Sequence, residues 1–135
     1  MTVNIRDVRP GFAFEDAKVR LSAPWVSGYL RAVGDSSGYY EDKNWVPPMA
    51  ILARSLTILM QQMVLPDGAL HAAQEVTSLK PARINDDVIF RARVSQSGIR
   101  GGWQLLILDI VADDVEGDPV MHGRITLSIP VEEEP

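Results

Sequence analysis

Cysteine is absent from this chain of 135 residues. Its absence excludes disulfide bonds, thiolate nucleophiles and cysteine-ligated metals. Basic residues are also few, with 13 Lys and Arg against 18 Asp and Glu, for a formal net charge of -5. A protein that binds nucleic acid needs a positive face, so we expect no nucleic-acid partner.

Long uninterrupted apolar segments are missing too. The most apolar stretch, residues 49–64, is broken by five polar side chains: Arg54, Ser55, Thr57, Gln61 and Gln62. A membrane-spanning helix needs about 18 or more successive apolar residues. The first ten residues also lack the basic-then-apolar order of a signal peptide. We therefore expect a cytoplasmic protein that does not enter a membrane.

The composition that is present fits one domain over residues 1–135. Hydrophobic residues make up 46% of the chain, which is enough for a core without disulfide or metal staples. The two histidines, His71 and His122, stand apart from any cluster of carboxylates, so we expect no metal site. We expect no cofactor either, and we interpret both histidines as residues of strands.

A first helix is predicted over residues 23–33. Ser22 is a good N-cap, and Pro24 lies in the first turn, where proline is tolerated. Apolar residues then recur at helical spacing, and Gly34 provides a stop. Residues 35–46 are predicted to form a polar, aromatic loop.

A second helix is predicted over residues 48–64, opened by Pro47 and Pro48. It is apolar on most sides, so we expect it to be buried on most sides. The turn residues 65–68 end it.

The apolar pattern then changes to a period of two, which indicates strands. Short turns between them favour an antiparallel meander, and a nearly all-apolar helix before a long sheet favours a sheet that wraps the helix. We expect the C-terminal tail from Glu132 to be solvated. The predicted strands are residues 70–79, 88–96, 103–111 and 119–130, with shorter ones near 12–14 and 18–21.

Several weak motifs, taken in order, resemble the MaoC-type dehydratases over about residues 22–130. They are Gly34-Asp35, Val46-Pro47-Pro48, His71-Ala72-Ala73-Gln74-Glu75, Lys80-Pro81, Asn85-Asp86-Asp87, Arg100-Gly101-Gly102-Trp103 and the turn at Gly117. The resemblance is closest to the N-terminal or non-catalytic domains of that family. It implies an α+β hotdog fold, in which the sheet wraps the helix at about 48–64, and pairing with another hotdog as a homodimer or heterodimer. It also implies an acyl-CoA or acyl carrier protein thioester as ligand, and reversible hydration of a 2-enoyl thioester as the reaction.

Active members of that family carry the pattern Asp-x-Asn-Pro-x-His. Here the aspartate is retained as Asp35, while Ser37, Gly38 and Tyr40 replace the asparagine, proline and histidine. Tyrosine has a reference pKa of about 10, which makes it a poor base at neutral pH, although it can donate a hydrogen bond. The resemblance implies catalytic roles for Asp35 and Tyr40. The residues alone also allow Asp35 to be a turn residue and Tyr40 a packing aromatic.

The start of the second helix is the expected site for a thioester oxygen, because the first helical turn has unpaired N–H groups. Pro48 has no N–H, so the amides of Met49 and Ala50 are the candidates. With Ser37, and with Arg100 for a nucleotide phosphate, these residues form the predicted substrate-binding set.

Three functions stay open at this point. The favoured one is a divergent or non-catalytic hotdog subunit that binds an acyl thioester and pairs with a catalytic partner. The second is a stand-alone enoyl-CoA hydratase with Asp35 as base. The third is a hotdog that acts as a thioesterase or binds a small ligand, which the lack of Asp and Glu in residues 48–64 disfavours.

Overall fold

The structure, a computed structural model, describes residues 2–132. Residues 133–135 of the tail predicted to be solvated lie outside the described residues. Three helices, one short 3-10 helix and seven strands follow one another in this part of the chain. They are β1 (Val3–Asn4), η1 (Ile5–Asp7), β2 (Ala17–Arg20), α1 (Ala23–Ala32), α2 (Tyr39–Lys43), α3 (Pro48–Met60), β3 (Met63–Val64), β4 (Leu70–Ser78), β5 (Asp87–Arg100), β6 (Trp103–Asp114) and β7 (Pro119–Pro130).

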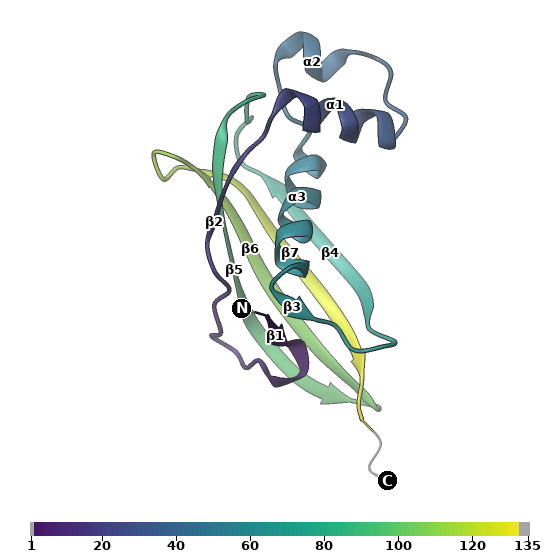
Figure 1. Cartoon of the computed structure of the whole chain (residues 1–135). Coiled ribbons are helices and arrows are strands. Elements are labelled where there is room, and N and C mark those ends of the chain that lie inside the picture. Colours follow the sequence, from purple (N-terminus) through teal and green to yellow (C-terminus); the bar gives the residue numbers. More distant parts are fainter. Residues whose placement is uncertain (1, 133–135) are drawn as a thin grey trace.

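Five of these strands form one antiparallel sheet in the order β2-β5-β6-β7-β4. The strands β5, β6 and β7 are successive hairpin neighbours, as the predicted meander requires. The prediction was wrong for β4, which pairs with β7 at the far edge and not with β5. The free side of β5 is taken by the short strand β2, and α3 lies across the sheet before β4 begins (Figure 1).

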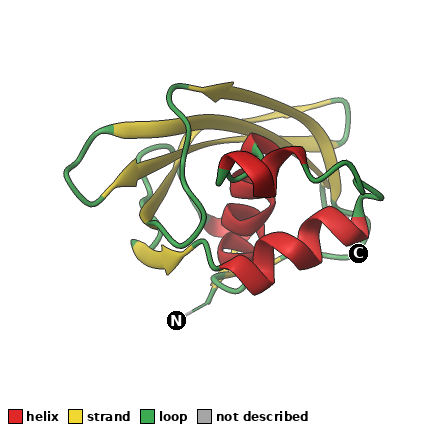
Figure 2. Ribbon diagram, turned by 90° about the horizontal axis from the view of Figure 1, so that it is seen from above, coloured by secondary structure: helices red, strands yellow, loops and turns green. Residues whose placement is uncertain are grey.

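The sheet wraps around α3, as predicted. Seen from above, the strands arch over α3 and the helices lie on the inner side of the curve (Figure 2). Leu52 approaches the sheet closely at Gly123, because a Cβ at Gly123 would lie 3.2 Å from Leu52 Cδ1. Because Gly123 on β7 has no side chain, α3 can pack closely against the sheet at this point.

The helix α3 ends at Met60, four residues earlier than predicted. Its last predicted residues, Met63 and Val64, form β3 and pair in parallel with β1. The side chain of Gln62 fixes this break, since it accepts the Glu15 N–H at 2.7 Å and donates to the Glu15 carbonyl at 3.0 Å. After Met60 the chain thus makes hydrogen bonds with the N-terminal segment, through Gln62 and Glu15, and does not form a further turn of helix.

The loop predicted over residues 35–46 contains a short helix, α2. Both of its flanking residues, Gly38 (φ 75°) and Asn44 (φ 59°), have the left-handed backbone conformation. Glycine and asparagine adopt that conformation at least cost. The two residues therefore bound one helical turn that hydrophobic periodicity does not reveal.

Candidate functional site

The carboxylate of Asp35 is held in a turn just after α1. Its Oδ1 atom accepts hydrogen bonds from the Ser37 hydroxyl at 2.7 Å and from the Ser37 N–H at 2.9 Å. The hydroxyl first, and then the N–H, hold the pKa of Asp35 below its usual value of 3.8. A carboxylate with a lowered pKa is a weaker base. Ser37 therefore fixes Asp35 and at the same time reduces its ability to take a proton from water.

Tyr40 stands at the position of the family histidine and is part of an aromatic cluster. Its ring lies edge-on to Tyr39, with centroids 5.2 Å apart, and Tyr39 in turn lies 6.4 Å from Trp45. The Lys43 ammonium lies 5.6 Å from the Tyr39 ring and 5.5 Å from the Trp45 ring. Tyr40 is half-buried and packs against the core, so at the position where the family pattern has a histidine this chain has a packing aromatic.

The first turn of α3 leaves one of the two predicted amides open. The Ala50 N–H donates to the Pro47 carbonyl at 2.9 Å, so it is already satisfied. The Met49 N–H has no backbone acceptor within residues 2–132. Pro48 fixes the start of the helix. Of the predicted pair, Met49 is thus the amide able to meet a thioester oxygen.

Arg100 lies far from these residues. It ends β5 at the turn into β6, whereas Asp87 begins β5 beside α1. A strand of this length spans roughly 40 Å, and Figure 1 places the α1–α2 region and the β5–β6 turn at opposite ends. Within one chain Arg100 does not share a site with Asp35, and its role toward a nucleotide phosphate stays a prediction that needs a second subunit.

One side of α3 is apolar and only partly covered. Met49, Ala53, Leu56 and Met60 recur there every three or four residues, and Met49 and Met60 are 44% and 49% exposed. The solvent side of a surface helix is normally polar. The prediction of burial on most sides is nevertheless confirmed for α3 as a whole, since between Pro48 and Met60 only Met49, Thr57 and Met60 are exposed.

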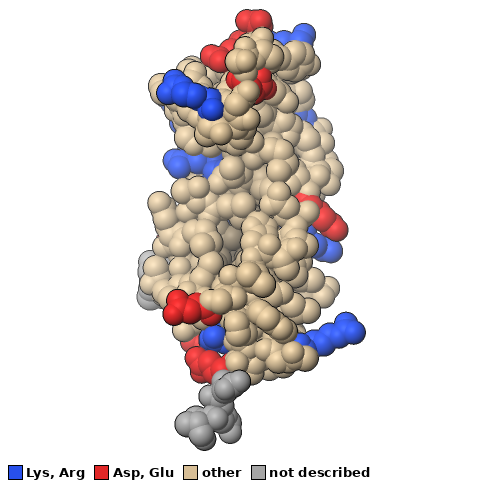
Figure 3. Space-filling model, turned by 90° about the vertical axis from the view of Figure 1, so that its right-hand side faces the viewer, with Lys and Arg blue, Asp and Glu red and all other residues tan. Residues whose placement is uncertain are grey.

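The neighbouring strand β4 is uncovered as well. It pairs with β7 on one side only, and eight of its nine residues are exposed. A free strand edge presents unpaired N–H and C=O groups to another chain. We call the surface made by Met49, Ala53, Leu56 and Met60 together with β4 the α3/β4 face. Figure 3 shows this side of the molecule as a broad surface without charge, with charged side chains mainly near its ends and margins.

Two further findings limit the chemistry of the described residues. Between residues 2 and 132, no three His, Cys, Asp or Glu side chains gather as a metal site would require. In the same part of the chain, no helix is long and apolar enough to cross a membrane. His71 and His122 lie exposed on β4 and β7, as the strand interpretation predicted.

Comparison with known proteins matches the chain to solved structures only. No protein-family model matches it, and neither does any curated protein. Among the solved structures, the (R)-hydratase from A. caviae involved in PHA biosynthesis has a TM-score of 0.73 at 16% identity, covering 93% of this chain and 99% of that one. The MaoC-like dehydratase from Rhodospirillum rubrum has a TM-score of 0.76 at 14% identity, covering 96% and 98%. The C-terminally truncated HadBC complex, a (3R)-hydroxyacyl-ACP dehydratase from Mycobacterium tuberculosis, has a TM-score of 0.70 at 17% identity, covering 88% and 96%.

These likenesses establish that the chain has the hotdog fold, which the sequence resemblance implied. The neighbours are the hydratases and dehydratases to which the resemblance pointed, and one of them is a complex.

Proposed function

We propose that this chain is an acyl-thioester-binding hotdog subunit that pairs with a second, catalytic hotdog of a hydratase or dehydratase. The observation that carries the proposal is the α3/β4 face, a partly covered apolar helix side beside a free strand edge. In this role the chain supplies one wall of the acyl-binding site, and its partner supplies the base.

The partner half of the proposal rests on the chemistry of that face. Pairing along the free edge of β4 provides hydrogen-bond partners for the N–H and C=O groups that point away from β7. The same contact removes the outward side chains of Met49, Leu56 and Met60 from water, which is worth about 25 cal/mol per Å² of apolar surface. A second hotdog, whose own helix and edge strand have the same layout, fits both demands at once.

The ligand half of the proposal rests on the start of α3. An acyl thioester has an apolar chain and one carbonyl oxygen that becomes negative during hydration. The Met49 N–H, at the positive end of the α3 dipole, suits that oxygen. The apolar outward side of α3 suits the acyl chain, and neither part requires a cofactor.

The claim that this subunit is not itself catalytic rests on Asp35 and Tyr40. A general base must be positioned against water and works best with a pKa near the operating pH. Asp35 is hydrogen-bonded to Ser37 and has a lowered pKa, and Tyr40 packs with Tyr39. The segment therefore holds no group suited to take the proton.

A stand-alone enoyl-CoA hydratase with Asp35 as base is the second candidate, favoured by the retained aspartate itself. A thioesterase is disfavoured, since α3 contains no carboxylate at any position from Pro48 to Met60.

The test combines activity and assembly. The purified chain is assayed for hydration of crotonyl-CoA alone, and then mixed with a candidate partner, a hotdog protein that has an intact Asp…His pair. We expect no turnover by the chain alone, turnover in the mixture above that of the partner alone, and a joint complex in light scattering. Turnover by this chain alone that Asp35→Asn abolishes would establish the stand-alone hydratase instead.

A further inference from the structure

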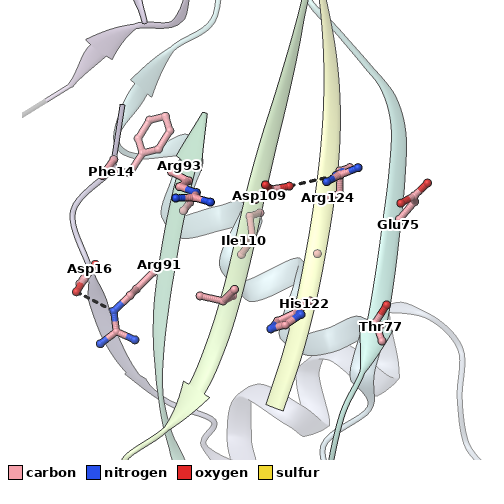
Figure 4. A pocket seen from close by; sticks show the side chains of 14 residues that line it. Phe14, Asp16, Glu75, Thr77, Arg91, Arg93, Asp109, Ile110, His122 and Arg124 are labelled. Carbon is pink, nitrogen blue, oxygen red and sulfur yellow. Dashed lines mark hydrogen bonds and ion pairs between the residues drawn. The ribbon is translucent and has the colours of Figure 1, made fainter. Parts of the chain in front are cut away.

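A row of alternating charges crosses the outer face of the sheet, the side away from α3. The registers place Arg93 opposite Asp109, Asp109 opposite Arg124, and Arg124 opposite Glu75. Each residue alternates along its strand with core-facing neighbours such as Val94, which is buried. From β5 to β4 the row reads positive, negative, positive, negative, and Figure 4 shows the four side chains in this order.

The two ends of the row have no ion pair among the described residues. In its middle, the Arg124 guanidinium pairs with the Asp109 carboxylate at 3.1 Å. Arg93 and Glu75, at the ends, appear in no such pair within residues 2–132. They lie three strand spacings apart, roughly 14 Å. One chain therefore cannot join Arg93 to Glu75.

The central strand β6 carries apolar residues on both of its faces, although Asp109 and Asp113 lie among them on the outer face. Its inner residues belong to the core, and on the outer face Leu105, Ile107 and Val111 flank Asp109 and are half-buried. A strand with one solvated face alternates apolar and polar residues, whereas a strand covered on both faces is apolar throughout. The pattern of β6 indicates that something covers the outer face.

The sign sequence of the row is self-complementary. A two-fold axis parallel to the strands and between β6 and β7 reverses the order of the row in a facing copy. Each positive side chain then meets a negative one, as an isologous interface requires. Arg93 faces Glu75 of the second copy, and the Asp109–Arg124 pairs of the two copies stack head to tail.

We propose that a second copy of this chain docks on the outer face of the sheet through this row. The row sets the register, and the apolar residues of β6 supply buried surface. The five strands have about 10 residues on average, which gives a face of about 800 Å², the area per partner of a standard interface. A hollow of about 730 Å³ over the outer face, lined by Arg93, Asp109, His122 and Arg124 among others, gives the facing side chains room to interleave.

This contact does not depend on the proposed function. Pairing at the α3/β4 face uses the edge of β4 and the inner side of the molecule, whereas the charged row projects from the outer side. The two contacts are compatible, and their combination would assemble pairs of hotdogs back to back.

The test is a charge swap followed by sedimentation equilibrium at low salt. It is run in a Met60→Glu background, which blocks association through the α3/β4 face. We expect the parent protein to dimerise, and Arg93→Glu or Glu75→Arg to weaken the dimer at least tenfold, because each brings like charges together. The double variant Arg93→Glu/Glu75→Arg should restore the dimer to within about threefold of the parent.

Recovery of the dimer by the double variant is the decisive result, because Arg93 and Glu75 are too far apart to compensate each other within one chain. Arg31→Glu makes the same change of charge on the exposed side of α1 and should leave the dimer unchanged. A monomer at all concentrations, single variants without effect, or a double variant no better than the single ones would each overturn the proposal. Circular dichroism of every variant checks that the fold is intact.

Discussion

The segment Asp35–Tyr40 and the helix α3 are both linked to thioester chemistry by the family resemblance, but they differ in what they retain. The segment keeps the aspartate, yet Ser37 holds it in a turn and Tyr40 packs among aromatics. The helix keeps an apolar side that is only partly covered in the described chain, including Met49 and Met60. The comparison fits the proposed subunit, in which the chemical machinery is absent and the surface that receives a partner is kept.

The largest expected effect is a loss of stability on substitution at the buried side of α3. Leu52 is buried against the sheet and only 1% exposed. Leu52→Ala should lower the free energy of unfolding by about 2–5 kcal/mol, through lost transfer energy and the cavity left behind. Urea unfolding of the isolated chain measures this change. A loss below about 1 kcal/mol would mean that α3 does not pack on the sheet as described.

The next effect concerns the outward side of α3. Met60→Glu puts a charge into the apolar part of the proposed interface, so partner binding should weaken by ten- to a hundredfold, or about 1.4–2.8 kcal/mol. The stability of the isolated chain should change by less than about 0.5 kcal/mol, because Met60 is exposed there.

Val33→Glu provides the matched control for Met60→Glu. Val33 is 57% exposed, lies just after α1 and is not one of the residues that make up the α3/β4 face. Titration of the partner by calorimetry should show unchanged affinity for Val33→Glu. Equal losses for both variants would contradict the assignment of the interface.

A smaller effect tests the Asp35 turn. Ser37→Ala removes the hydroxyl that chiefly lowers the pKa of Asp35, so the pKa should return toward 3.8. A carboxylate with a depressed pKa stabilises the fold above its unfolded pKa, and this contribution is lost as the pH falls through the folded pKa. Ser37→Ala should therefore remove most of this contribution, so that Asp35 binds its proton at a higher pH and the stability of the turn depends less on pH. NMR titration of the Asp35 carboxyl carbon follows the shift, and a Thr variant at Ser37 should keep the low pKa.

The features that local patterns control were predictable from the sequence. Ser22 caps α1, Pro48 opens α3, and the period of two marks β5 to β7. The sequence also showed that Tyr40 stands where the family pattern has a histidine.

What the sequence did not reveal depends on contacts between distant residues. The edge position of β4 and the early end of α3 follow from pairing with β7 and with the N-terminal segment through Gln62. The short helix α2 depends on the backbone of Gly38 and Asn44. An apolar helix side also looks the same in sequence whether its own chain or another chain covers it, so the exposure of Met49 and Met60 could not be predicted.

The most direct test of the central claim compares two aspartates in one reconstituted complex. Crotonyl-CoA hydration is measured with Asp35→Asn in this chain, and separately with the same substitution in the Asp…His pair of the partner. We predict that Asp35→Asn leaves the rate within about twofold, while the substitution in the partner lowers it at least a hundredfold, the range expected for loss of a general base. A hundredfold loss from Asp35→Asn would contradict the account and make this chain catalytic.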